Sequence, residues 1–157
     1  MARVHFQLDE DLMQKLRALE AREIDEACRK ACYVGGHILL DEVRHELTDK
    51  IGSHPQTKRD KEHGSRSTGE LVKALGCTPV RINYKGEYDV KIGFNEPRKN
   101  RSGKRDQTNA KIATVLEYGK ADGTQPPRPF LAPAIKKVRK KALAEMESVL
   151  SEAIEKA

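Results

Sequence analysis

The feature that most constrains this chain is a long amphipathic segment from Glu23 to Asp49. Apolar or small side chains recur along it at intervals of three and four residues, which is the spacing of one helix face. The stripe consists of Ile24, Cys28, Ala31, Gly35, Leu39, Val43 and Leu47. The adjacent pair Gly35 and Gly36 in its middle costs about 2 kcal/mol of helix propensity. The segment therefore predicts a long helix with a kink or a close backbone crossing at the glycine pair.

A second one-sided helix is predicted at the end of the chain. Its apolar stripe consists of Leu131, Ile135, Val138, Ala142, Met146, Val149 and Ala153. The passage from Pro126 to Pro129 fixes backbone angles just before this helix, and proline is tolerated in a first helical turn. Two long helices with one apolar stripe each must bury those stripes against other parts of the fold.

Shorter elements are predicted before and between these helices. Val4, Phe6 and Leu8 alternate with polar residues as in a short strand, and Asp9 offers an N-cap to a helical run beginning near Asp11.

Further along, Ser67 and Glu70 have capping-box spacing, and Gly76 closes a predicted helix of about two turns. Two alternating segments, 80–84 and 88–94, flank a turn and predict a β-hairpin.

The segment from Ile112 to Leu116 predicts another short helix that stops at Gly119. Thr114 and Val115 leave a strand as the alternative.

Two polar segments, from Gly52 to Arg66 and from Glu96 to Thr108, contain almost no apolar residues. They cannot bury enough surface to order themselves, so both are predicted to be mobile loops. Their candidate contact residues are Lys58, Arg59 and Lys61 in the first loop and Arg98, Lys99, Arg101, Lys104 and Arg105 in the second. Such residues suffice for phosphate contacts, but neither loop interleaves aromatics for base stacking, so a solvated loop is the alternative.

The length of 157 residues suits a single domain over 1–157. The predicted class is α+β, with the long helix of the N-terminal half and the C-terminal helix packed on a small antiparallel sheet. No apolar run approaches the roughly 18 residues of a membrane span, and no signal peptide is recognisable, so we expect synthesis in the cytosol and no membrane partner. The net charge of +6 fits a nucleic acid, a membrane surface or an acidic protein and does not choose among them.

Candidates for chemistry are few. His37, Asp41 and His45 follow one helix flank, but the catalytic zinc motif places a glutamate between two histidines four residues apart, and that order is absent. Cys28 and Cys32 lack a second close cysteine pair, because the chain has three cysteines, so core packing is favoured. No phosphate-binding glycine loop or nucleophile elbow occurs. We therefore expect no enzyme activity, no cofactor and no metal.

The charges of the last helix run against its dipole. Basic residues fill its first turns and acidic residues gather toward its end, and each exposed residue so placed is unfavourable by roughly a few tenths of a kcal/mol. We expect an acidic neighbouring subunit to cover the basic end, with Lys136, Lys137 and Lys140 as contacts. An ordinary solvated helix is the alternative.

Four short segments follow one another along the chain. They are Thr68-Gly69-Glu70-Leu71, Val90-Lys91-Ile92-Gly93, Leu116-Glu117-Tyr118-Gly119 and Pro129-Phe130-Leu131-Ala132-Pro133-Ala134. Together they resemble the tail-component, or head-tail joining, proteins of long-tailed bacteriophages. The resemblance covers about Glu23 to Ala157 and is strongest from Leu116 to Ile135. Asn109-Ala110 departs from it, because the family usually carries a Tyr-Ala pair in this region.

The resemblance implies a structural virion subunit of the neck or tail-completion apparatus of a phage or prophage. Such subunits form a ring, commonly of six, and their partners are other copies of themselves and the connector and tail proteins. Pro129, Phe130 and Leu131 would anchor the last helix against the sheet or contact a neighbouring subunit. The basic loops would meet ring neighbours, the connector or the tail tube, or line a channel with weak DNA contact. A free nucleic-acid-binding module is the alternative function.

Overall fold

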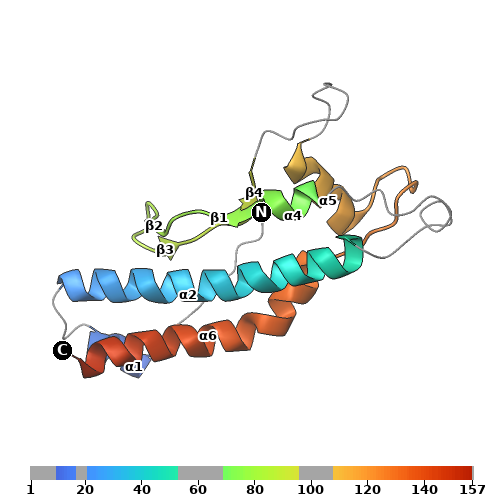
Figure 1. The fold of residues 1–157 in the computed structure, drawn as a ribbon. Helices are drawn as coiled ribbons and strands as arrows, with labels where there is room; N and C mark the ends of the chain where they lie inside the picture. Colours follow the sequence, from blue (N-terminus) through green and yellow to red (C-terminus); the bar gives the residue numbers. More distant parts are fainter. Residues whose placement is uncertain (1–9, 17–20, 53–68, 96–107, 157) are drawn as a thin grey trace. The chain divides into compact units, whose positions relative to one another are not determined.

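The computed structural model describes residues 10–16, 21–52, 69–95 and 108–156 (Figure 1). The predicted first strand with its Asp9 cap, the capping residue Ser67 and nearly all of both basic loops lie outside these ranges.

The predicted α+β class is confirmed, because two long helices accompany small antiparallel two-stranded sheets. The described elements are α1 (Glu10–Leu16), α2 (Ala21–Leu47), the π-helical turn η1 (Thr48–Gly52), α4 (Glu70–Ala74), β1 (Leu75–Cys77), β2 (Arg81–Ile82), β3 (Tyr88–Asp89), β4 (Ile92–Phe94), α5 (Asn109–Tyr118) and α6 (Leu131–Glu155).

The chain divides into two compact units. The first takes its residues from 1–39, 77–92 and 138–157, and the second from 40–76 and 93–137. The helices α2 and α6 each contribute one part to each unit. Both units have buried apolar side chains of their own, and the single domain over 1–157 stays a prediction.

In the first unit, the core lies between the beginning of α2 and the end of α6. Ala27 and Ala31 of α2 pack with Leu150 of α6, and Leu12 of α1 packs against this cluster. The buried residues of this cluster are small on α2 and larger on α6, so the two helices can approach closely along this length. Ala27 and Leu150 lie beside the predicted stripes. This core forms because each of the two helices carries its apolar residues on one side, as predicted.

The glycine pair of α2 marks a close approach, and α2 continues through it as a helix. A Cβ on Gly36 would lie 2.7 Å from Cγ1 of Val90, and a Cβ on Gly35 would overlap the side chain of Met146. Both glycines are buried. They are needed because the neighbouring side chains occupy the space that a larger residue would fill.

The hairpin of the first unit is shorter than predicted. β2 and β3 pair antiparallel with Ile82 opposite Tyr88, and the turn between them contains Gly86 at φ 79°. The predicted strand 88–94 was wrong as one element, because it divides into β3 and β4, and β4 pairs with β1 instead of β2. Val80 and Tyr84 also lie outside β2.

The short helix before β1 ends earlier than predicted. Gly76 does not close it, because α4 ends at Ala74 and Leu75 is already extended at φ −70°, ψ 128°. Leu75 is buried and begins β1, so pairing with β4 takes precedence over another helical turn.

The helix predicted near Ile112 is confirmed, and the strand alternative is wrong. α5 begins after Thr108, whose side-chain oxygen accepts a hydrogen bond from the Lys111 N–H at 3.2 Å. It ends at Tyr118, and Gly119 follows at φ 79°. The N-cap and the glycine at the end are the usual helix boundaries.

We expect Gly36→Ala to destabilise the protein by up to about 2 kcal/mol. Overpacking against the stiff Val90 side chain costs about 1–3 kcal/mol, and removing a helical glycine recovers about 1 kcal/mol. Gly35→Ala is the matched control, because the long, flexible Met146 side chain can move aside. Urea denaturation followed by circular dichroism measures both. Equal losses of stability in the two variants would contradict the account that the Val90 side chain leaves no room for a larger residue at position 36.

Candidate functional site

The beginning of α6 is held by one carboxylate, Glu117 of α5. Its Oε2 accepts hydrogen bonds from the backbone N–H groups of Phe130 at 2.8 Å and Leu131 at 2.9 Å, and its Oε1 accepts one from Ala132 at 3.1 Å. The next residue, Pro133, has no N–H, and the Ala134 N–H bonds to the Phe130 carbonyl. Every backbone donor of the first turn is therefore accounted for.

Glu117 is nearly inaccessible to solvent, with 6% of its surface exposed. A buried carboxylate is costly unless hydrogen bonds and opposite charge compensate its lost hydration. Here three N–H groups and the positive end of the α6 dipole supply that compensation. Among the described residues, no basic side chain forms an ion pair with it.

The loop between α5 and α6 closes tightly, which brings Glu117 to the residues that it caps. The Arg128 N–H donates to the Leu116 carbonyl at 2.6 Å, and the Lys120 N–H donates to the Gln125 carbonyl at 3.0 Å. A Cβ on Gly119 would lie 3.0 Å from the Gln125 oxygen and 3.1 Å from Pro127, at a φ of +79°. Glycine is required at position 119 by both the backbone angle and the lack of space.

The residue just before α6, Phe130, also packs on β4. Phe130 is fully buried, and its ring meets that of Phe94 in β4 edge-on, with centroids 6.3 Å apart. Pro129 is exposed, and its carbonyl accepts a hydrogen bond from Lys50 Nζ at 2.8 Å. Leu131 is half-buried. Of the three predicted anchor or contact residues, Phe130 is therefore the one with the most complete packing.

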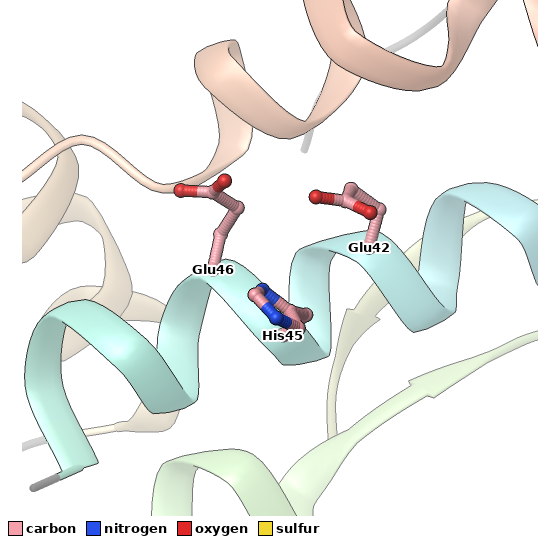
Figure 2. Close-up of side chains that lie close together, drawn as sticks. All are labelled: Glu42, His45 and Glu46. Carbon is pink, nitrogen blue, oxygen red and sulfur yellow. The ribbon is translucent and has the colours of Figure 1, made fainter.

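A second cluster of charges lies on α2 in the same unit. Figure 2 shows Glu42 and Glu46 extending toward the same side of the helix, with His45 on the turn between them. The potential ligand atoms of these three residues lie within 4.8 Å of one another. Lys137 Nζ, however, lies 2.6 Å from the buried Oε1 of Glu42 and 3.9 Å from Glu46. The close contact with Glu42 and the nearby acids raise the pKa of Lys137. Lys137 is the cation paired with Glu42, and the nearer cation of Glu46 is Lys50, at 3.0 Å.

Two of the three residues considered as metal ligands in the sequence have other partners, and His45 lies in the cluster with Glu42 and Glu46. Asp41 forms an ion pair with Arg44 at 2.9 Å, and His37 Nδ1 lies 3.0 Å from the Tyr33 carbonyl. His37 Nε2 lies 3.9 Å from Cys77 Sγ. The pairing of Glu42 and Glu46 with Lys137 was missed, although the spacing of four residues between the two glutamates was a signal that they share a helix face.

In the first unit, a polar cluster attaches the hairpin to α2. The Tyr88 hydroxyl donates to Asp25 Oδ1 at 2.8 Å, and Arg29 Nε donates to Asp25 Oδ2 at 2.7 Å. Arg29 also donates to the Val80 carbonyl at 3.3 Å, and its guanidinium lies over the Tyr88 ring. Burial and the bond to Asp25 raise the pKa of Tyr88 to about 12. The bonds from Arg29 and Tyr88 lower the pKa of Asp25, so this cluster has a structural role.

Two of the cysteines are half-buried on α2. Cys28 packs against the cluster formed by Ala27, Ala31 and Leu150. Burial raises the pKa of both Cys28 and Cys32, which disfavours the reactive thiolate. This agrees with core packing as their role.

The predicted contact residues fall into two groups. Those of the basic loops, from Lys58 to Lys61 and from Arg98 to Arg105, lie outside the described residues. Lys136, Lys137 and Lys140 are exposed on α6, and Lys137 is paired with Glu42 of its own chain.

In the described part of the chain, no helix is long and apolar enough to cross a bilayer. No family model, curated protein or solved structure matches the chain.

We expect Glu117→Ala to lower the free energy of unfolding by about 2–4 kcal/mol. Three backbone donors would lose their acceptor in a buried position, at roughly 1 kcal/mol or more each. Glu117→Gln should lower the free energy of unfolding by about half as much. The amide oxygen of glutamine still accepts hydrogen bonds, but its NH₂ group cannot accept one from a backbone N–H. Chemical denaturation followed by circular dichroism measures the loss.

Glu145→Ala is the matched control for these variants. Glu145 is exposed on α6 and has no hydrogen-bond or ion-pair partner among the described residues, so its removal should change stability by less than about 0.5 kcal/mol. If Glu117→Ala behaves like this control, the carboxylate does not hold the helix as described.

The Tyr88 hydroxyl gives a separate prediction about pH. Because its pKa is raised in the folded protein to about 12, its bond to Asp25 contributes fully below the unfolded pKa of about 10 and is lost as the pH rises through 12. A titration of phenolate absorbance should contain a component with a midpoint near 12 while circular dichroism still reports folded protein. Tyr88→Phe should remove that component. Its persistence in the variant would assign it to another tyrosine.

Proposed function

We propose that this chain is a structural virion subunit that acts in head-tail joining or tail completion of a tailed phage or prophage. The proposal begins from the four segments that resemble those phage proteins. In this proposal, copies of the chain form a ring where the head meets the tail. Connector and tail proteins are its further partners.

The observation that carries the proposal is the contact between two of those four segments. Glu117 belongs to Leu116-Glu117-Tyr118-Gly119, and the three N–H groups that it accepts belong to Pro129-Phe130-Leu131-Ala132-Pro133-Ala134. Gly119 permits the tight loop between them, and Phe130 is fully buried. The residues of these two segments therefore act together to fix the start of α6.

A fixed helix start suits a part that transmits force between neighbours. The second unit is also the unit that both basic segments interrupt, because the described residues on either side of them, 52 and 69 and then 95 and 108, belong to it. Segments with little apolar content gain order from a partner surface. We propose that Lys58, Arg59, Lys61, Arg98, Lys99, Arg101, Lys104 and Arg105 make such contacts with neighbouring subunits.

A structural role also accounts for the contacts of three acids among the described residues. Glu117 caps α6, Asp25 bonds to Arg29 and Tyr88, and Glu42 pairs with Lys137. Each has a partner that stabilises the fold, which supports a subunit that works by assembly.

Deletion of the gene from the phage or prophage that carries it tests the proposal. We expect lysates with filled heads and separate tails, or tails of abnormal length, under the electron microscope. Expression of the intact chain from a plasmid should restore joined, infectious particles. Glu117→Ala should restore fewer, and the matched Glu145→Ala should restore as many as the intact chain.

Fully infectious, normally joined particles from the deletion would contradict the proposal. Fluorescence anisotropy with duplex DNA over a salt series tests the alternative. Tight binding that weakens steeply with salt would favour a nucleic-acid-binding module instead.

A further inference from the structure

The outer face of α6 is exposed along the part that belongs to the first unit. Lys141, Ala144, Ser148, Ser151 and Glu155 are all exposed and follow one another at intervals of three and four residues. They therefore form one stripe, on the side of the helix away from its buried residues. The small side chains in the middle of the stripe would allow another backbone to approach closely.

Charge is divided between the two ends of this face. Lys140 and Lys141 lie toward the start of α6, and Glu147, Glu152 and Glu155 lie toward its end, all of them exposed. Of these charges, Glu152 and Glu155 lie in the last turn of α6, where the helix dipole disfavours acids.

The described residues of the chain leave most of these charges unpaired. Lys156 lies 3.9 Å from Glu152, at the outer limit of an ion pair. In the described ranges, Lys140, Lys141, Glu147 and Glu155 have no ion-pair partner. Lys137 differs from them, because Glu42 of the same chain already pairs with it.

We propose that this face binds the same face of a second copy of the chain, with the two α6 helices antiparallel. In that orientation the basic end of each helix lies on the acidic end of the other, and the small residues meet in the middle. The reversed direction also places each basic block near the negative end of the partner's dipole. A parallel pair in register would bring like charges together.

The charge pattern identifies the partner as a second copy, because one face carries both halves of a complementary pair. A purely basic face would fit any acidic partner, and a purely acidic face any basic one. Exposed ion pairs are individually weak and are screened by salt, so the association should be moderate in strength and sensitive to salt. The proposal does not rest on the phage function.

Charge reversal on each half of the face tests the proposal in the full-length chain. One variant combines Lys140→Glu with Lys141→Glu and makes the face acidic. The other combines Glu147→Lys with Glu152→Lys and makes it basic. Sedimentation equilibrium at low salt, over a wide range of protein concentration, should show dimers of the intact chain and monomers of each variant alone.

Mixing the two variants in equal amounts should restore dimers, and a chain with all four reversals should again pair with itself. The matched control combines Lys111→Glu with Lys120→Glu, two exposed lysines of the second unit, and should dimerise like the intact chain. Circular dichroism checks that each variant is folded.

Monomers of the intact chain at every concentration would overturn the proposal. So would dimers that survive both reversals, since another surface would then hold them. Failure of the mixture and of the fourfold variant to associate would also overturn it, because complementary charge would not be the cause.

Discussion

A single buried carboxylate determines how the second unit of this protein is built. Glu117 gives α6 a starting point, because it accepts the three backbone N–H groups that the first turn leaves without partners. The arrangement requires a tight loop, and the loop requires glycine at position 119. Burial of Phe130 against Phe94 then places the start of the helix on β4.

The first unit is held by a different kind of constraint, which is close packing of side chains against the backbone of α2. Small residues on α2 allow Met146 and Val90 to come near Gly35 and Gly36. The cluster of Asp25, Arg29 and Tyr88 then attaches the hairpin to α2 through directed hydrogen bonds. Apolar contact and these hydrogen bonds together attach the hairpin to α2.

Periodicity predicted the long elements well, because an apolar stripe over several turns leaves few alternatives to a helix. Both long helices and α5 were anticipated within a few residues. The division of segment 88–94 into β3 and β4 was not, because alternation shows which face is buried but not which strand is the partner. Gly76 looked like a helix end, although pairing of Leu75 with β4 decided the boundary. The role of Glu117 was also missed, since a glutamate on a short helix gives no sign of which helix start it will reach.

Amide hydrogen exchange at the start of α6 tests the central claim most directly. If Glu117 accepts the N–H groups of Phe130, Leu131 and Ala132, these amides should exchange about 100-fold or more slowly than in an unstructured peptide, as in stable parts of a fold. In folded Glu117→Gln protein, their protection should fall while that of the amides in the middle of α6 is kept. Exchange at peptide rates in the intact chain would show that the carboxylate does not hold this helix.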